Sequence, residues 1–232
     1  MGILICGLNG TGKSTLGAAL AACLGYAFID NEDLFFPKED PAYLFSSPRS
    51  KEEAVCLLEE RIRENDRFVF AAVRGDYGNL LLRSLTHIVF IEVPQEIRKE
   101  RVRQRSYRRF GERILPGGDL YEKEQAWFSM TDARTETYVT KWLENAACPV
   151  IRVDGTLPVE ENIRYLLPLL NGPGGETGAS DSSEQRTPAG TCCRCSLMET
   201  SSGAAASYYA FSGSASSHSR MQVSVFSGNR LK

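Results

Sequence analysis

The chain has 232 residues, of which 42% are hydrophobic, enough for a sizeable core in one or two domains. Its formal net charge of −2 argues against a general nucleic-acid or membrane binder. The sequence predicts no signal peptide, and no apolar run approaches the roughly 20 residues that span a bilayer, so we expect a cytoplasmic protein.

The composition changes near residue 171. From there on Gly, Ser, Ala and Thr dominate, and such a segment cannot bury enough apolar surface to offset its ordering entropy. We therefore expect one domain over residues 1–170 and a low-complexity, disordered tail over residues 171–232. The tail holds a cluster of three cysteines, Cys192, Cys193 and Cys195. A metal or palmitoyl site is one interpretation, but no second Cys or His pair stands at ligand spacing, which favours an unstructured segment.

The domain begins with a short apolar strand over residues 3–6, followed by the loop GLNGTGKST over residues 7–15. This loop has the Walker A spacing, in which backbone N–H groups wrap a polyphosphate. An Ala- and Leu-rich helix over residues 14–24 follows, and its N-terminus adds a partial positive charge. Strand, loop and helix in this order predict a nucleotide site, with expected ligands Gly7, Asn9, Gly10, Thr11, Gly12, Lys13, Ser14 and Thr15.

Two side chains of this loop have predicted chemical roles. Lys13 is expected to reach the β- and γ-phosphates, which makes it a catalytic candidate, and Ser14 is expected to bind Mg²⁺. The predicted cofactors are therefore ATP and Mg²⁺.

Strands and helices alternate through the rest of the domain. The sequence predicts strands over residues 26–30, 67–73, 87–93 and 149–153, and helices over residues 51–65, from 94 onward, about 120–145, and 158–170. Near-continuous apolar strands separated by helices indicate a parallel sheet covered on both faces. The predicted fold class is α/β, a P-loop NTPase fold with a five-stranded parallel sheet, helices on both faces and a small Arg-rich lid.

Charged side chains follow the predicted strands at the edge where α/β proteins bind ligands. The second strand ends at Asp30 and precedes Glu32 and Asp33, and the third precedes Arg74 and Asp76. Asp30 is predicted either to orient Mg²⁺ through water or to accept a hydroxyl proton. The alternative for such acids is helix capping, and Arg74 could be a surface charge. Their convergence on one edge favours a site.

Residues 98–113 contain eight basic residues and two acidic ones. At about 100° per residue on a helix, five of the arginines fall within one arc: Arg98, Arg101, Arg105, Arg108 and Arg109. Solvated helix faces normally mix charge signs, so this cationic stripe indicates anion binding. The Gly-rich segments that follow suit a lid that folds onto phosphates.

The order of elements, the loop GLNGTGKST, and the phrases VPQEIRKERVRQR and VDGTLPVEENI resemble the nucleoside-monophosphate-kinase-like branch of P-loop kinases, which includes adenylate, shikimate and gluconate kinases. The resemblance covers residues 1 to about 170, and the chain is also similar to a bacterial group described only as ATP-binding. It implies that Arg101 and Arg105 clamp ATP and act in catalysis, that the turn over residues 154–158 passes the adenine edge, and that Arg74 faces the acceptor.

The second strand ends in FIDNEDLFFP, which is similar to the F-x-D-x-D pattern of shikimate and gluconate kinases and unlike the Thr-Gly-Asp stretch of adenylate kinases. The expected acceptor-binding segment, residues 35–49, matches none of them. The predicted substrate ligands are Asp30, Glu32, Asp33, Arg49, Arg74 and Asp76.

The favoured function is a kinase that moves the γ-phosphoryl group of MgATP to a hydroxyl of a small-molecule acceptor, with charge neutralisation and a carboxylate supplying the rate. One alternative is a nucleoside monophosphate kinase, whose anionic acceptor would be held by Arg49, Arg61 and Arg74. A regulatory ATPase is less favoured, because RFVFAAVRGD has no acid at the end of its apolar run. An RNA-end kinase would rely on the stripe and a platform of only two aromatics.

Overall fold

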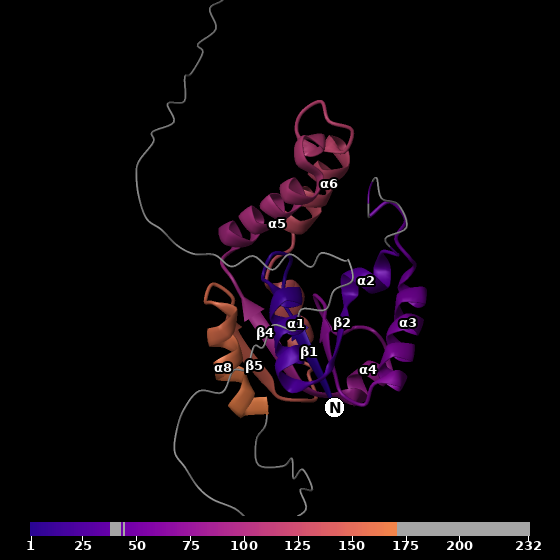
Figure 1. Ribbon diagram of the computed structural model, residues 1–232, viewed down its shortest axis with the longest axis vertical. Coiled ribbons are helices and arrows are strands. Elements are labelled where there is room, and N and C mark those ends of the chain that lie inside the picture. Colours follow the sequence, from indigo (N-terminus) through magenta and orange to yellow (C-terminus); the bar gives the residue numbers. More distant parts are fainter. Residues whose placement is uncertain (38–42, 44, 171–232) are drawn as a thin grey trace, which may run out of the picture. The chain divides into compact units, whose positions relative to one another are not determined.

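The structure is a computed structural model that describes residues 1–37, 43 and 45–170 (Figure 1). The predicted tail over residues 171–232, with its three-cysteine cluster, lies outside the described residues. Within the described ranges, no helix is both long and apolar enough to cross a membrane.

Five strands form one sheet in which every neighbouring pair is parallel. They are β1 (Gly2–Cys6), β2 (Ala27–Asp30), β3 (Phe68–Ala71), β4 (Leu85–Glu92) and β5 (Val150–Asp154). Their order across the sheet is β2-β3-β1-β4-β5, so β1 is the central strand. The predicted five-stranded parallel sheet is confirmed, and the carboxyl ends of its strands meet at one edge.

Helices cover both faces of the sheet. Since successive residues of a strand point to opposite faces, each strand contributes side chains to both cores. Ile3 and Ile5 of β1 belong to a core with α1 (Lys13–Leu24) and α8 (Val159–Leu170). Leu4 and Cys6 belong to a second core with α3 (Lys51–Glu64), α4 (Asn79–Ser84) and α7 (Thr137–Leu143). Figure 1 shows α8 and α3 on opposite sides of the strands. A strand buried on both faces explains why residues 3–6 are continuously apolar.

A third, smaller core lies in the lid, which consists of α5 (Gln95–Phe110), the 3₁₀ helix η1 (Gly111–Ile114) and α6 (Tyr121–Asp132). Its buried members are Val102, Ile114, Leu120 and Phe128. Two hydrogen bonds of 2.9 and 2.6 Å from the Arg113 guanidinium to the Asp119 carboxylate join the two sides of the tip. Figure 1 shows α5 and α6 projecting beyond the carboxyl edge of the sheet, which confirms the predicted Arg-rich lid.

The single helix predicted over residues 120–145 is wrong, because the structure has two helices, α6 and α7, separated at residues 133–136. The two helices serve different cores: Phe128 of α6 is buried in the lid, whereas Val139 of α7 is buried against the sheet. One straight helix could not place both side chains in their cores. The β-branched Thr135 and Thr137 at the break weaken a continuous helix and bond to each other through their hydroxyls at 2.6 Å.

Two short helices were not predicted, α2 (Asn31–Phe35) and α4. Each has only five or six residues, too few to show a helical period in the sequence. By contrast, the predicted helix over residues 51–65 is confirmed as α3. It begins with a capping box in which Ser50 and Glu53 each accept a backbone N–H bond from the other.

Candidate active site

The loop over residues 7–15, called the phosphate loop below, joins the central strand β1 to α1. Two of its glycines are required by space as well as by backbone conformation. Gly10 has φ +84°, and an added Cβ would lie 2.4 Å from the carbonyl oxygen of Arg98. Gly7 has φ +146°, and its Cβ would lie 2.8 Å from the carbonyl oxygen of Ile91. The loop is therefore packed directly against β4 and the first turn of α5.

Lys13 is the first residue of α1 and is half-buried. Its Nζ donates a hydrogen bond of 2.9 Å to the carbonyl oxygen of Leu8, within the same loop. The pKa of Lys13 is lowered to about 8, chiefly by burial and also by the nearby Arg105 and Arg134, whereas Asp30 and Cys6 act in the opposite direction. An ammonium in this setting is favoured by an added anion.

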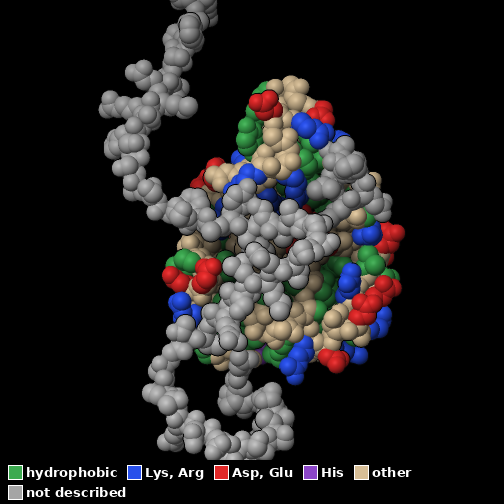
Figure 2. Space-filling model, viewed as in Figure 1, with side chains coloured by type: hydrophobic (Ala, Val, Ile, Leu, Met, Phe, Trp, Pro, Cys, Tyr) green, Lys and Arg blue, Asp and Glu red, His purple; other side chains and the backbone are tan. Residues whose placement is uncertain are grey.

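A cavity of about 600 Å³ opens beside the phosphate loop. Seven predicted site residues from three parts of the chain line it. The loop contributes Asn9, Gly10, Lys13 and Ser14, the end of β2 contributes Asp30 and Glu32, and the lid contributes Arg105. Figure 2 shows Lys and Arg side chains gathered where the lid meets the rest of the domain. The structure thus unites predicted site residues from Asn9 to Arg105, which are 96 positions apart in the sequence.

Asp30 combines two of its predicted properties. Its Oδ1 accepts a hydrogen bond of 2.9 Å from the backbone N–H of Glu32, so it caps α2. It also lines the cavity, as does Glu32. Asn31 is fixed by the Tyr77 hydroxyl, which donates to its Oδ1 at 2.5 Å. Asp33, on the same short helix, is exposed and lies outside the cavity lining.

The expectation of one continuous cationic stripe on α5 is wrong. Arg98 is only 5% exposed, and its Nε donates to the carbonyl oxygen of Val93 at 3.2 Å, so burial removes it from the surface. Arg101 donates to the carbonyl oxygen of Gly155 at 2.9 Å and is absent from the cavity lining. Of the five arginines, Arg105 alone lines the cavity.

The outer part of α5 is joined to the end of β2 by ion pairs. Glu32 lies 3.0 Å from a guanidinium nitrogen of Arg109 and 3.9 Å from one of Arg105. The carboxylate of Glu32 is therefore neutralised by the lid, whereas that of Asp30 accepts a hydrogen bond from backbone.

The turn after β5 lies against the base of the lid. Besides the contact of Gly155 with Arg101, an added Cβ on Gly155 would lie 2.9 Å from the carbonyl oxygen of Thr11 in the phosphate loop. Asp154 accepts bonds of 2.8 and 2.6 Å from the backbone N–H and the hydroxyl of Thr156, which shapes the turn. The passage of adenine along this turn stays a prediction.

Four predicted acceptor ligands lie outside the cavity lining: Asp33, as described above, and Arg49, Arg74 and Asp76. Arg49 donates to the carbonyl oxygen of Leu34 at 3.0 Å, which anchors the segment after α2. Arg74 pairs with Asp76 at 3.1 Å, and its guanidinium carbon lies 3.9 Å from the ring centroid of Tyr138. These side chains tie the ends of β3 and α7 together.

Sequence reasoning missed Arg134, which lies between α6 and α7. Its guanidinium donates to Oδ1 of Asn9 in the phosphate loop at 3.0 Å. Arg134 was not predicted as a site residue because it lies inside the single helix predicted over residues 120–145. The threonines at 131, 135 and 137 were the signal for a break, but nothing in the sequence directs the residue toward Asn9.

The loop fits a nucleoside triphosphate with Mg²⁺. The glycine cradle and the N-terminus of α1 suit a polyphosphate, and Ser14 and Asp30 line one cavity from which both could hold the metal. Among the described residues, no group of three or more His, Cys, Asp or Glu side chains could hold a metal ion. Mg²⁺ in such sites is commonly held by one or two protein oxygens together with substrate phosphates.

A family model described as "AAA domain" matches residues 3–126, more than half of the chain. The chain belongs to this AAA domain family. The matched part of the AAA domain begins in β1 and ends within α6, so it includes the phosphate loop, Asp30 and Arg105. The "Uncharacterized protein YqaC" of Bacillus subtilis (strain 168) is 29% identical over 177 residues, which cover 73% of this chain and 97% of that protein.

Two solved structures are similar to this chain. A gluconokinase from Sinorhizobium meliloti 1021 is 20% identical and aligns over 72% of this chain and 89% of its own, with a TM-score of 0.43. A shikimate kinase from Aquifex aeolicus vf5 is 21% identical and aligns over 75% of this chain and 100% of its own, with a TM-score of 0.41.

Proposed function

We propose that the AAA domain transfers the γ-phosphoryl group of MgATP to a hydroxyl group of a small molecule. The observation that carries this proposal is the presence of Lys13 and the Asp30 carboxylate in the wall of one cavity at the carboxyl edge of the sheet. Phosphoryl transfer depends mainly on positioning and charge stabilisation, together with a group that orients or deprotonates the nucleophile. The cavity supplies both kinds of group.

The residues divide this work between them. The backbone of the phosphate loop and Lys13 hold the outer phosphates, and Ser14 with Asp30 would hold Mg²⁺, which adds positive charge at the phosphates when bound. Arg105 approaches the same cavity from the lid. The acceptor hydroxyl forms the new bond to the γ-phosphorus as the bond to the β–γ bridging oxygen breaks, and Asp30 accepts the hydroxyl proton.

The distribution of charges supports a hydroxyl acceptor over a nucleoside monophosphate. An acceptor phosphate is already an anion, needs no base, and requires cations around it. Arg49, Arg61 and Arg74 lie outside the cavity lining, and the first and last of these are engaged with Leu34 and Asp76. Asp30 instead lines the cavity with its carboxylate bonded to backbone, and it would repel an acceptor phosphate placed beside it.

The end of β3 supports transfer to a bound acceptor over hydrolysis by a regulatory ATPase. β3 is the neighbour of β1, and the residues at its end that line the cavity are Ala71, Ala72 and Val73. None of these side chains can hold Mg²⁺ or activate a water molecule. The carboxylate that would act on the nucleophile is therefore that of Asp30, at the end of β2, which is one strand farther from β1 than β3 is.

The test is ADP release by the full chain with MgATP, measured against a panel of alcohols and a panel of nucleoside monophosphates. We expect turnover on an alcohol, and a fall of about 100-fold or more in Asp30→Asn with ATP affinity nearly unchanged. Asparagine caps a helix as well as aspartate does, so the melting temperature should hold.

Asp66→Asn is the matched control, because Asp66 is an exposed acid beside the amino end of β3, away from the carboxyl edge. Its turnover should equal that of the unaltered chain. Normal turnover in Asp30→Asn, or turnover on monophosphates alone, would overturn the proposed function.

A further inference from the structure

The wall of the cavity outside its polar part is lined by aromatic and apolar side chains. Its principal members, called the aromatic wall below, are Phe36, Tyr43, Phe45, Trp127 and Met130. The first three precede α3, whereas Trp127 and Met130 belong to α6 of the lid. The aromatic wall is thus built from two separate parts of the chain.

The part of the aromatic wall before α3 is packed edge to face. The ring centroids of Phe36 and Phe45 lie 4.8 Å apart with an interplanar angle of 73°, and those of Tyr43 and Phe45 lie 5.6 Å apart at 86°. The Tyr43 hydroxyl donates to Oε1 of Glu124 in the lid at 2.8 Å. These contacts hold the rings in place before any ligand binds, which lowers the entropic cost of binding.

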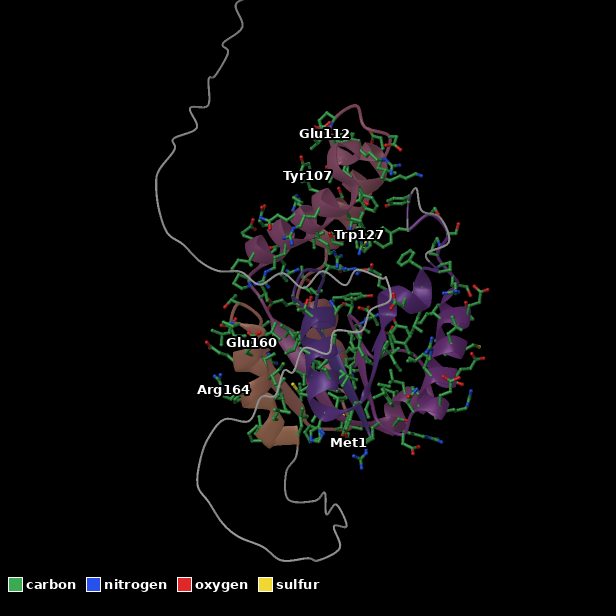
Figure 3. The ribbon with its side chains drawn as sticks, viewed as in Figure 1. Met1, Tyr107, Glu112, Trp127, Glu160 and Arg164 are labelled. Atoms are coloured by element: carbon green, nitrogen blue, oxygen red, sulfur yellow. The ribbon has the colours of Figure 1, made fainter. Side chains whose placement is uncertain are left out.

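Trp127 differs from these rings. It is half-buried on the lid, and among the described residues its indole forms no aromatic ring pair. Figure 3 labels it between the lid helices and the sheet, whereas Tyr107 lies farther along the lid. A large aromatic face in the wall of a cavity offers a stacking surface to a ligand.

A polyhydroxylated acceptor fits the aromatic wall poorly. Each of its hydroxyls that met the wall would lose hydrogen bonds to water without replacement, which disfavours binding. A flat heteroaromatic ring has the opposite preference, because its faces are apolar and stack on aromatic side chains. Since Glu32 is already paired with Arg105 and Arg109, the cavity favours an uncharged ring over a cationic one.

We propose that the acceptor is a hydroxyl compound with an uncharged heteroaromatic ring, the chemistry that a nucleoside offers, and that its ring stacks on Trp127 opposite Phe36 and Phe45. This inference rests on the proposed function, because the hydroxyl must reach Asp30 while the ring contacts the aromatic wall. It assigns Trp127 to acceptor selection, a role that no motif in the sequence indicates.

Tryptophan fluorescence tests the binding half. The chain has two tryptophans, Trp127 and Trp142. Trp142 does not line the cavity; its ring packs beside Gly75, where an added Cβ would lie 2.6 Å from it. A Trp142→Phe chain therefore reports on Trp127 alone. With a non-hydrolysable ATP analogue present, we expect adenosine, guanosine, cytidine or thymidine to quench its emission at concentrations where ribose does not. Equal effects of ribose and all four nucleosides would overturn the inference.

Steady-state kinetics tests the same point in a chain that keeps Trp142. Trp127→Leu should raise KM for the nucleoside about tenfold or more and leave KM for ATP unchanged, because one stacked base is lost. Tyr107→Leu is the matched control, since Tyr107 is a lid aromatic that is 49% exposed and absent from the cavity lining. An unchanged nucleoside KM in Trp127→Leu would contradict the assignment.

The acceptor panel separates the two proposals. Phosphorylation of ribose, polyols or hydroxy acids without any turnover on nucleosides would overturn this inference and leave the proposed function standing. Failure of every hydroxyl compound, with or without turnover on nucleoside monophosphates, would overturn the proposed function itself.

Discussion

At the scale of single residues, burying the charged ammonium of Lys13 lowers the stability of the ligand-free protein. Its lowered pKa of about 8 means that the folded chain releases this proton below the ordinary value of 10.5. Between these values the unfolded chain binds more protons, so the stability of the ligand-free protein rises with pH across that range. Below about pH 8 the charge is present in both states, and the folded state bears the cost of burying it.

Phosphates reverse this preference, because they favour the charged ammonium. We predict that a non-hydrolysable ATP analogue binds with net proton uptake at about pH 8.5, and that its affinity falls as the pH rises further. Calorimetry in buffers of different ionisation enthalpy measures the uptake directly. Lys13→Arg is the control, since a guanidinium stays charged and should show no comparable uptake. Equal uptake by both proteins would assign the proton to another group.

The residues of the site differ in how far the sequence predicts them. The phosphate loop is readable because its chemistry depends on contiguous residues with fixed spacing. Asp30 follows from the rule that ligands bind at the carboxyl ends of parallel strands. Arg134 and Trp127 are not readable, because their positions depend on where α6 ends and how the lid packs. The predicted place of Arg98 in the cationic stripe was wrong, because helical periodicity tells which side of α5 a residue is on but not whether that side is buried.

At the scale of elements, the lid and the phosphate loop are joined at the start of α5. Gly10 approaches the backbone of Arg98, Arg101 bonds to the turn after β5, and Arg109 reaches Glu32 beyond β2. The base of the lid is therefore connected to β5 and its outer part to β2. If the loop binds phosphates as proposed, they would lie between these two connections, so we predict that phosphate binding and the position of α5 are coupled.

A pair of glycine substitutions tests the contact at Gly10. Gly10 and Gly117 have similar backbone angles, φ +84° and +90°, but an added Cβ has open space only at Gly117. Both Gly→Ala changes should bear a backbone cost of about 1 kcal/mol. Gly10→Ala must also displace the backbone of α5, so we expect a further loss of ~1–3 kcal/mol in the free energy of unfolding.

Chemical denaturation of the two variants measures this difference. Similar unfolding free energies for Gly10→Ala and Gly117→Ala would show that the loop and α5 separate without cost, and would remove the proposed coupling.

At the scale of the whole molecule, hydrophobic patterning determined most of the architecture. Five apolar runs predict five buried strands, and the parallel sheet follows from the helices between them. The order β2-β3-β1-β4-β5 was not predictable in the same way, because it depends on which strands pair across long connections. The short helix α2 was missed for lack of a period, although its cap Asp30 was recognised as a possible capping residue.

The final prediction concerns residues 171–232. Among the described residues, the core over β1 and β4 extends to Leu170, the last residue of α8, which is buried together with Leu166. The described residues that line the cavity lie between Asn9 and Arg105 and on α6. Since the remaining sequence is poor in large apolar residues, we predict that a chain ending at Asn171 keeps its ATP affinity and its melting temperature.

Calorimetry and thermal unfolding of the chain ending at Asn171 and of the full chain check this prediction. A second truncation after residue 158 is the control, because it removes α8 and with it Leu166 and Leu170 from the core over β1 and β4. It should lower stability by several kcal/mol, since each large aliphatic side chain lost from a core costs about 2–5 kcal/mol. A comparable loss in the chain ending at Asn171 would show that residues beyond α8 pack on the domain.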